Sequence, residues 1–443
     1  MGYMGGSPHV ALPWTQPVRA RWQAVERAVT ETEIRDSAAL EAVIMSYNLQ
    51  HRGKSTWEFS VLHRLFSEKP DLAAYFFSSV FPGMVRLLLS SPTSLPGHLP
   101  LLAAGRASSV TLDRHQVSVI LVNGFFCTWQ DRNEKETNLP NANFNILYGR
   151  SELVSKARPG REEACLQKLL CLVSYFSQVV VSPPSGPVTF SRLVLDSSPD
   201  WASSSRHLSS IHLMATGDIT TSQGHLQVDF ANKFVGGGVL RSGMGQEEVR
   251  FITWPELMAS RLLTEALGDQ EALVVTGAEQ FSLHTGFGDS FQFKGDVLAG
   301  TDTRGGRTNI VAMDAVKYSP EAEDQFTFSQ VQRELNKAFV AFHSKNEGDL
   351  EAVATGNWGC GAFGGDPHLK LVIQLLAASE AGRDLQYYTF GDEELVKEGR
   401  ELFVNNRPGA TVGELYTTVK FFCDMTGTEK TGEKLFQHLR GKH

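Results

Sequence analysis

Two adjacent carboxylates, Glu247 and Glu248, follow three consecutive glycines at 236–238 after a short spacer. Three glycines in a row suit a backbone that approaches a ligand closely, because no side chain stands in the way. Paired carboxylates beside such a loop could carry out general acid and base catalysis. Asp229 and Asn232 precede the glycines and add polar groups that an ordinary loop does not need. The residues alone leave a second interpretation open, in which both glutamates are first-turn helix acids stabilised by the helix dipole.

A second glycine cluster, GNWGCGAFGGD at 356–366, contains the pattern G-x-G-x-x-G. Asp366 and Pro367 at its end are typical of a helix start, with the aspartate as N-cap and the proline in the first turn. The backbone N–H groups of such a turn can bind a pyrophosphate at the helix N-terminus. A merely tight turn between strand and helix would give the same pattern. A nicotinamide-dependent oxidoreductase is a further alternative, which the late position of the pattern in the chain disfavours.

The hydrophobic pattern indicates the elements that position these loops. Residues 1–182 are expected to form a mainly helical accessory domain, because apolar residues recur at helical spacing in segments such as 37–47 and 166–181. In residues 183–443, short β-rich runs alternate with helical segments, which predicts an α/β fold with a mostly parallel or mixed sheet and ligands at the carboxyl ends of strands. The expected strands are 188–195, 211–215, 226–230, 272–276, 310–316, 350–354 and 385–390.

Length and composition limit the classes of function. The chain has 443 residues, of which 42% are hydrophobic, and a formal net charge of −8. These values are typical of a globular protein and argue against a broad nucleic-acid-binding surface. The first twenty residues lack the apolar segment of a signal peptide, and we expect no membrane span. Five scattered cysteines without a CxxC pair argue against a structural zinc site and fit an intracellular location. We expect no bound metal, and a location in the nucleus, the cytoplasm or both.

The stretch LQVDFANKFVGGGVLRSGMGQEEVRF at 226–251 closely resembles the signature of the poly(ADP-ribose) glycohydrolase family: three glycines, a short spacer, which has seven residues here, and Gln-Glu-Glu. Further similar segments extend the resemblance over residues 110–425. The resemblance implies a macrodomain-like mixed sheet flanked by helices and preceded by a mainly helical accessory domain. It also implies hydrolysis of the ribose–ribose O-glycosidic bonds of poly(ADP-ribose) on modified proteins, mainly from the free end, with release of ADP-ribose and without a cofactor. We expect a monomer that binds neither DNA nor membranes.

The resemblance also implies roles for single residues. Glu248 matches the family's catalytic acid, Glu247 matches the neighbour that hydrogen-bonds the ribose, and Asp229 belongs to the same catalytic group. The positions matched to the substrate pocket are Ile219, Thr220, Asn232, Gly236, Gly237, Gly238, Gln246, Phe287, Asn357, Gly359, Cys360, Gly361, Ala362, Phe363, Gly364 and Phe390.

Within this set, the resemblance makes the two glycine clusters the loops that wrap the ribose and the diphosphate. Gln246 matches an adenine-side contact, and Phe390 matches the aromatic ring that stacks on adenine. Two positions depart from the family's pattern. Phe287 stands where the family has a tyrosine, so a stacking surface remains but a phenolic hydrogen bond is lost. Thr220 falls where the family has an acid that reads adenine.

The bond to be broken defines what the site must do. A ribosyl bond breaks through an oxocarbenium-like state and needs a proton on the leaving oxygen. Our hypothesis is that Glu248 donates this proton to the 2′-oxygen and then acts as base on the attacking water, because adjacent residues cannot easily flank the sugar as an opposed pair. The alternative is a macrodomain that binds ADP-ribose without cleaving it. The intact Gln-Glu-Glu disfavours it, since such a reader needs the diphosphate loop but not the acid.

Overall fold

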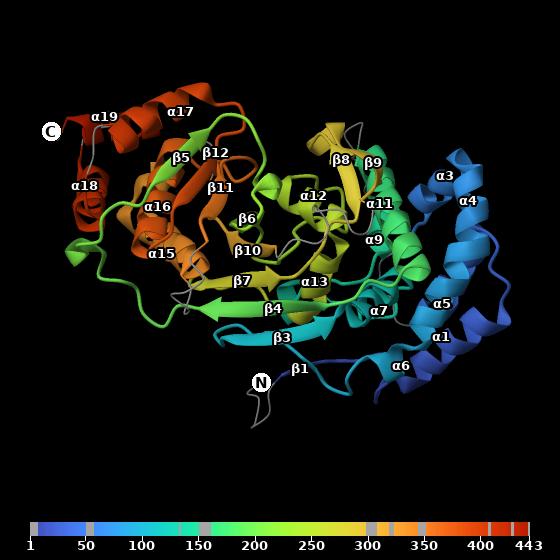
Figure 1. Cartoon of the computed structure of the whole chain (residues 1–443). Coiled ribbons are helices and arrows are strands. Elements are labelled where there is room, and N and C mark those ends of the chain that lie inside the picture. Colours follow the sequence, from blue (N-terminus) through green and yellow to red (C-terminus); the bar gives the residue numbers. More distant parts are fainter. Residues whose placement is uncertain are drawn as a thin grey trace.

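The computed structural model describes residues 8–49, 57–132, 134–149, 161–297, 308–318, 323–343, 351–405, 409–426 and 429–441. In this part of the chain, eight strands form one sheet with helices on both of its faces, and a group of helices lies beside one end of it (Figure 1). Two pairs of short strands form separate small sheets.

The first part of the chain is mainly helical, as expected. Local sequence sets several helix starts, because Asp36 and Asp113 are N-caps whose carboxylates accept backbone N–H groups of the first turn. The elements are α1 (Arg19–Glu31), α2 (Ser37–Asn48), α3 (Ser60–Glu68), α4 (Pro70–Tyr75), the π-helical turn η1 (Phe76–Val80), α5 (Phe81–Leu89), α6 (Ser91–Ser94), α7 (Arg114–Phe125), α8 (Glu134–Thr137), α9 (Asn145–Tyr148) and α11 (Arg161–Val181).

The large sheet has the strand order β3-β4-β7-β10-β6-β11-β12-β5. Its strands, in that order, are β3 (Ser108–Asp113), β4 (Pro187–Val194), β7 (Glu271–Thr276), β10 (Asn309–Asp314), β6 (Leu226–Ala231), β11 (Val353–Gly356), β12 (Leu385–Tyr388) and β5 (Ile211–Met214). The strands from β3 to β10 pair antiparallel, whereas those from β10 to β5 pair parallel. The sheet is therefore mixed, and the carboxyl ends of its parallel strands meet at one edge.

The remaining elements cover the sheet or carry its loops. Two antiparallel pairs are β1 (His9–Val10) with β2 (Leu99–Pro100), and β8 (Ser282–Thr285) with β9 (Gln292–Asp296). The helices are η2 (Trp201–Ser203), η3 (Ile219–Thr221), α12 (Gln246–Thr253), η4 (Pro255–Met258), α13 (Ala259–Leu263), η5 (Gly288–Ser290), η6 (Glu323–Phe326), α15 (Phe328–Phe342), α16 (Pro367–Glu380), α17 (Glu393–Gly399), η7 (Arg400–Asn405), α18 (Val412–Asp424) and α19 (Gly432–Arg440).

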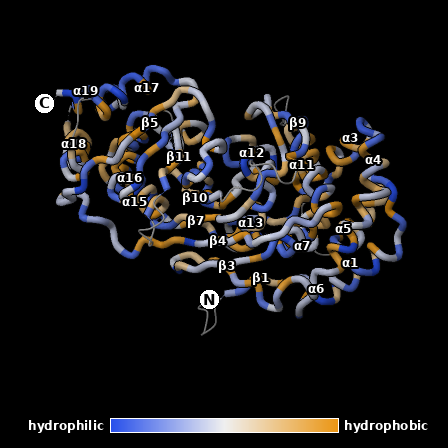
Figure 2. The backbone as a smooth tube through the Cα atoms, in the orientation of Figure 1, coloured by the Kyte–Doolittle hydropathy of each residue, from blue (hydrophilic) through white to orange (hydrophobic). Residues whose placement is uncertain are grey.

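Both faces of the sheet are buried. Because side chains alternate along a strand, Ile310 and Ala312 of β10 join the core of the helical region, whereas Val311 and Met313 join a second core with α15 and α16. Hydrophobic residues accordingly gather where the helices meet the strands (Figure 2). One face of the sheet therefore shares its core with the helical region.

The edge strand β3 was not expected from the sequence. It lies before the expected domain boundary at 182/183 but pairs with β4, from Ser108 opposite Arg192 to Asp113 opposite Pro187. The two parts of the chain are thus joined by a strand ladder as well as by the shared core. The boundary stays a prediction. The strands that were expected lie close to their predicted positions. Residue 350 of the expected run 350–354 is outside the described residues.

Two helical stretches of the described chain are long and apolar enough, by length and composition alone, to cross a membrane. They are Pro70–Leu89 and Glu162–Val181, and 44% and 67% of their most apolar windows are buried in the protein. Both stretches contribute residues to the core shared with the sheet. Since core helices pass the same test, they are weak evidence for a membrane span.

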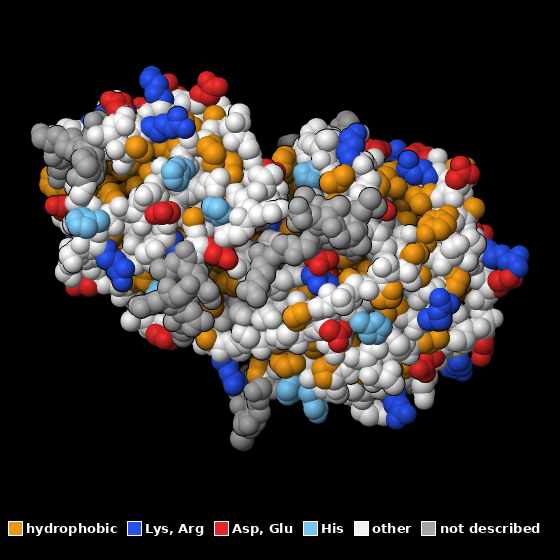
Figure 3. Space-filling model, viewed as in Figure 1, with side chains coloured by type: hydrophobic (Ala, Val, Ile, Leu, Met, Phe, Trp, Pro, Cys, Tyr) orange, Lys and Arg blue, Asp and Glu red, His pale blue; other side chains and the backbone are white. Residues whose placement is uncertain are grey.

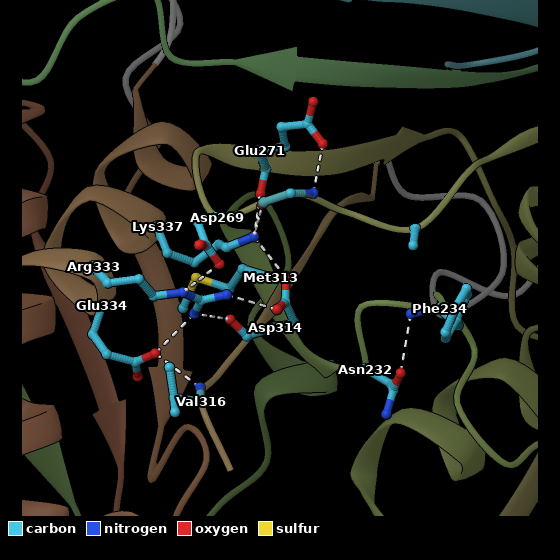
Figure 4. A network of polar contacts seen from close by, with 12 residues as sticks. Asn232, Phe234, Asp269, Glu271, Met313, Asp314, Val316, Arg333, Glu334 and Lys337 are labelled. Atoms are coloured by element: carbon cyan, nitrogen blue, oxygen red, sulfur yellow. Dashed lines mark hydrogen bonds and ion pairs between the residues drawn. The ribbon is translucent and has the colours of Figure 1, made fainter. Parts of the chain in front are cut away.

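A buried ionic network fixes α15 against the sheet (Figure 4). The carboxylate of Asp314, at the end of β10, accepts hydrogen bonds from Arg333 Nη2 at 2.8 Å and Lys337 Nζ at 2.6 Å. Arg333 also donates to Glu334, whose Oε1 accepts the N–H of Val316 at 2.9 Å. Because buried charges need partners, this network fixes the residues that leave β10 toward the carboxyl edge.

Candidate active site

A cavity of about 560 Å³ lies at the carboxyl edge of the parallel strands. In the space-filling view the surface is hollowed between the lobe that carries β5 and β12 and the lobe that carries β8 and β9 (Figure 3). Two loops form its walls: the first glycine loop (residues 232–245), between β6 and α12, and the second glycine loop (residues 357–366), between β11 and α16. Of the predicted site residues, the cavity is lined by Asn232, Gly237, Gly238, Gln246, Glu247, Glu248, Phe287, Asn357, Gly359, Cys360, Gly361, Ala362, Phe363 and Phe390.

The first glycine loop holds both adjacent carboxylates with its backbone. Glu247 is 5% exposed, and it accepts the N–H of Asn232 at 3.0 Å and the N–H of Gly236 at 2.6 Å. Glu248 is more exposed and accepts the N–H of Gly238 and the N–H of Gly245, each at 2.8 Å. The loop therefore fixes two carboxyl groups that both line the cavity, and Glu248 is the more exposed of the two.

The same glutamates occupy the first turn of α12. Gly245 is the N-cap, and Glu248 at the third helical position reaches back to its N–H. Both interpretations of the sequence thus apply at once, since the helix start places the acids and the helix dipole stabilises their negative charge. Glycine is required at Gly237, where φ is +44° and a Cβ atom would stand 2.5 Å from Glu247 Oε2.

Gln246 uses its amide within the protein. Its Oε1 accepts the N–H of Phe230 at 2.8 Å, and its Nε2 donates to the carbonyl of Val228 at 3.1 Å. Both backbone partners belong to β6, so this side chain fastens the start of α12 to the sheet. Its expected contact with adenine stays a prediction.

Asp229 lies on β6 outside the cavity lining, 1% exposed, and neither of its carboxylate oxygens has a hydrogen-bond partner among the described residues. Burial raises the pKa of Asp229 to about 8, while the nearby Arg250 opposes the shift. Burial, together with the neighbouring Asp229 and Glu248 carboxylates, also raises the pKa of Glu247 well above its usual range. Both shifts favour the protonated forms of Asp229 and Glu247.

The second glycine loop is closed by its own backbone. The N–H of Cys360 donates to Asn357 at 3.1 Å, that of Gly364 to Gly361 at 3.0 Å, and that of Gly365 to Gly359 at 2.9 Å. Asp366 then caps α16 by accepting the N–H of Leu369 at 3.0 Å, as the sequence predicts.

The N–H groups of Gly361, Ala362 and Phe363 have no partner among the described residues, and these residues line the cavity. Unpaired backbone N–H groups beside a helix N-terminus are the donors that a phosphate group uses. Asn357 is held alongside them, since it donates to the carbonyl of Thr389 at 3.0 Å and accepts from Tyr387 at 3.1 Å.

Aromatic rings stand at two places on the cavity wall. Phe390, 48% exposed, meets Phe230 edge to face with ring centroids 6.3 Å apart. Its φ of +55° is uncommon for a residue with a side chain. Phe287, 47% exposed, projects from the loop between β8 and η5, where Gly288 N–H donates to the carbonyl of Met244 at 2.9 Å. Both rings are available to stack on a planar or sugar group.

Several predicted residues lie beside the cavity rather than in its wall. Ile219 is buried and packs with Ala354 and Tyr388, while Thr220 follows it on η3. Gly236 and Gly364 also stand outside the lining, each at a positive φ within its loop. Asn232 lines the wall, but its Oδ1 accepts the N–H of Phe234 at 3.0 Å (Figure 4).

Sequence reasoning missed other residues of the site. Phe230, Ala315, Trp358 and Thr389 line the cavity. Phe230 lies near the end of β6, Ala315 and Thr389 directly follow β10 and β12, and Trp358 comes two residues after β11. Position near a carboxyl strand end was therefore the available signal. Among the described residues, no group of three or more His, Cys, Asp and Glu side chains is placed to hold a metal ion.

Similarity to known proteins agrees with this geometry. A family model described as the helical domain of poly(ADP-ribose) glycohydrolase matches residues 69–192, and one described as the macro domain fold of the same enzyme matches residues 198–397. A probable poly(ADP-ribose) glycohydrolase 2 of Arabidopsis thaliana is 29% identical, over 92% of this chain and 90% of its own. Poly(ADP-ribose) glycohydrolase 2 of Caenorhabditis elegans is 31% identical, over 76% of this chain and 69% of its own. The expected fold, a macrodomain-like sheet preceded by a helical region, is thereby confirmed.

Proposed function

The chain belongs to the poly(ADP-ribose) glycohydrolase family and is an enzyme that hydrolyses poly(ADP-ribose) to ADP-ribose, and we propose that Glu248 is its catalytic acid and base, acting mainly at the free end of the polymer. The observation that carries the proposal is the position of Glu248. It lines the cavity, is partly exposed, and is fixed by two backbone N–H groups. A positioned carboxyl group that a ligand can reach is what proton transfer requires.

The proposal places the terminal ADP-ribose unit along the cavity. The unpaired N–H groups of the second glycine loop suit the diphosphate, and the ring of Phe390 suits the adenine, since aromatic side chains stack on bases. The distal ribose then lies against Glu247 and Glu248. A chain end fills such a site more readily than a chain interior, because one end of the unit must be free to enter.

In this arrangement Glu248 can transfer the proton, and nearby negative charge can stabilise the sugar cation. Glu248 gives its proton to the leaving 2′-oxygen as the bond between that oxygen and the anomeric carbon breaks. The diphosphate and the carboxylate of Glu248 stabilise the oxocarbenium-like sugar. Water attacks the anomeric carbon, and its proton passes to Glu248, which restores the starting state. The raised pKa values of Glu247 and Asp229 favour their protonated forms and so limit the negative charge beside the leaving oxygen.

The partners follow the same proposal. The substrate is poly(ADP-ribose) attached to modified proteins, and the product is ADP-ribose. We further propose an intracellular monomer, nuclear, cytoplasmic or both, that binds neither DNA nor membranes directly.

The decisive experiment compares wild type with Glu248→Gln on purified poly(ADP-ribose). The variant cannot donate or accept the catalytic proton, so we expect cleavage to fall about 10²–10⁴-fold. Calorimetry should show that ADP-ribose still binds. Glu394→Gln, an exposed glutamate on α17 that only pairs with Lys397, is the control and should cleave as wild type does.

Near wild-type cleavage by Glu248→Gln would show that another group donates the proton. If neither protein cleaves but both bind ADP-ribose, the site is that of a reader. The departures at Phe287 and Thr220 would then be the first changes to revert.

A further inference from the structure

A buried arginine contacts the first glycine loop from behind the cavity wall. Arg261 of α13 is 3% exposed, and its Nη1 donates to the carbonyls of Val235 and Gly237, each at 3.1 Å. The N–H groups of these same two peptide units belong to the next residues, Gly236 and Gly238. They are the groups that donate to Glu247 at 2.6 Å and to Glu248 at 2.8 Å. One guanidinium nitrogen is therefore connected to both carboxylates, each through a single peptide unit.

This arrangement has a direct electrostatic consequence. A peptide unit is a dipole with its negative end at the carbonyl and its positive end at the N–H. Each of the two units has its carbonyl on a cation and its N–H on a carboxyl group, so the hydrogen bond at the cation is charge-assisted and strengthens the one at the N–H. The dipoles hold Glu247 and Glu248 in place, and the Gly236 N–H opposes the effect of burial on the pKa of Glu247.

A lysine from the helical region holds the rest of the loop. Lys168 of α11 is fully buried, and its Nζ donates to the carbonyls of Val239 at 3.0 Å and Arg241 at 2.8 Å, and also to that of Gly243. Gly243 lies against Glu248, since a Cβ atom there would stand 2.7 Å from Glu248 Oε1. The loop carbonyls thus face two buried cations, while its N–H groups face the two carboxylates.

We propose that Arg261 is a positioning residue for the hydrolysis, which orients Glu247 and Glu248 and tunes their proton affinity through the two peptide units that it binds, with Lys168 fixing the remainder of the loop. The proposal rests on the function proposed above. It gives the helical region and α13 a defined part in the chemistry, although neither cation lines the cavity.

Other charged groups near the pair are distributed over several elements. Asp229 on β6 lies beside Glu247 and Glu248, and Arg250 on α12 lies beside Asp229. The groups around Arg261 are Lys168, Arg132, Glu134 and Arg241. All of them remain when Arg261 is replaced. A change in pH dependence on replacing Arg261 therefore reports that cation alone.

The test measures the pH profile of polymer cleavage for wild type, Arg261→Met and Arg261→Lys. Loss of the cation disfavours the ionised carboxylates, so for Arg261→Met we expect the whole profile of kcat/KM to move up by about one pH unit. We also expect kcat to fall at least about tenfold, with ADP-ribose affinity within about threefold of wild type because the second loop is untouched. Arg261→Lys should keep the pH profile but lose kcat, since an ammonium lacks the planar fork of a guanidinium.

Arg192→Met is the matched control for lost stability. Arg192 is 1% exposed and donates to the carbonyls of Leu102 at 3.0 Å, Glu265 at 2.8 Å and Ala266 at 2.7 Å, away from the two catalytic carboxylates. Its replacement should lower the melting temperature as Arg261→Met does, without moving the pH profile.

The outcomes separate this inference from the proposed function. Absence of cleavage by wild type would overturn the function and this inference with it. Cleavage by wild type with an unshifted profile in Arg261→Met, or an equal shift in Arg192→Met, would overturn this inference alone. If Arg261→Met does not fold, Arg261→Lys decides: reduced kcat at unchanged ADP-ribose affinity supports the proposal, and wild-type kcat overturns it.

Discussion

Both glycine loops that form the cavity contain backbone hydrogen bonds of their own, but they differ in the side chains that bind them. The second glycine loop closes on itself through three backbone hydrogen bonds and ends at the N-cap Asp366. The first glycine loop depends on side chains far away in sequence, since Lys168 and Arg261 bind its carbonyls. In the first loop, the N–H groups of Gly236 and Gly238 bind Glu247 and Glu248. In the second loop, unpaired N–H groups face the open cavity. The difference assigns the chemistry to the loop whose carbonyls bind two buried cations, and ligand binding to the loop whose N–H groups face the cavity.

The largest expected difference between the two loops is that between an alanine substitution in the first loop and one in the second. In Gly237→Ala, the new methyl group would stand 2.5 Å from Glu247 Oε2 and 2.7 Å from Glu248 Oε1, at a φ of +44°. Displacement of the acids by about 1 Å should lower kcat about 10²-fold. In Gly361→Ala, no heavy atom lies within 4 Å of the new methyl group, so the fold and kcat should remain and any effect should appear in KM. Equal losses of kcat in the two variants would abolish the distinction between the loops.

The second loop was readable from sequence because its determinants are local. G-x-G-x-x-G, the aspartate cap and the proline start lie within a dozen residues, and the structure forms them in place. The supports of the first loop are not local. Lys168 is an isolated cation in the otherwise apolar helix expected at 166–181, which is a signal of a buried charge, but no spacing indicates that its partners are carbonyls about seventy residues further on. The resemblance found the acids, whereas only the fold shows what holds them.

The strand β3 shows a similar limit of sequence reasoning. Its residues, SSVTLD, have one exposed and one buried face and lie in a helical neighbourhood. What makes them a strand is the unpaired edge of β4, which the local pattern does not contain. The pairing of β3 with β4 also joins the helical region to the sheet. The accessory helices and the first glycine loop contribute to one hydrophobic core.

Replacing Phe390 tests whether its ring contributes to the binding of ADP-ribose rather than to the chemical step. Base–aromatic stacking contributes about 1–3 kcal/mol, so Phe390→Ala should weaken ADP-ribose binding about 5- to 150-fold while kcat stays within about threefold. Phe421→Ala, at a ring 55% exposed on α18, is the control and should bind normally. Unchanged affinity in Phe390→Ala, measured by calorimetry, would place the adenine elsewhere.

Asp229, beside the two carboxyl groups of the first loop, should make the stability of the protein depend on pH. Burial raises its pKa to about 8 in the folded protein, against about 3.9 when unfolded. The stability that this group contributes is fully present below about pH 4 and is lost as the pH rises through about 8, because the unfolded chain ionises first. Asp229→Asn cannot ionise, so its melting temperature should fall less than that of wild type between pH 5 and pH 8. Parallel curves would show that Asp229 is already ionised in the folded state.

The smallest expected effect is at Phe287, which belongs to neither loop. Its hairpin is held by α11, where Gln167 accepts the N–H of Phe293 at 3.0 Å and Gln178 donates to the carbonyl of Phe281 at 3.0 Å. The helix that supports the first glycine loop therefore also sets this part of the wall. A hydroxyl added by Phe287→Tyr can donate one hydrogen bond to a bound ligand, worth about 0.5–1.5 kcal/mol. ADP-ribose should then bind about two- to tenfold more tightly, with kcat unchanged. A change in kcat instead would mean that this wall acts with the carboxylates, and that the division between chemistry and binding does not follow the two loops.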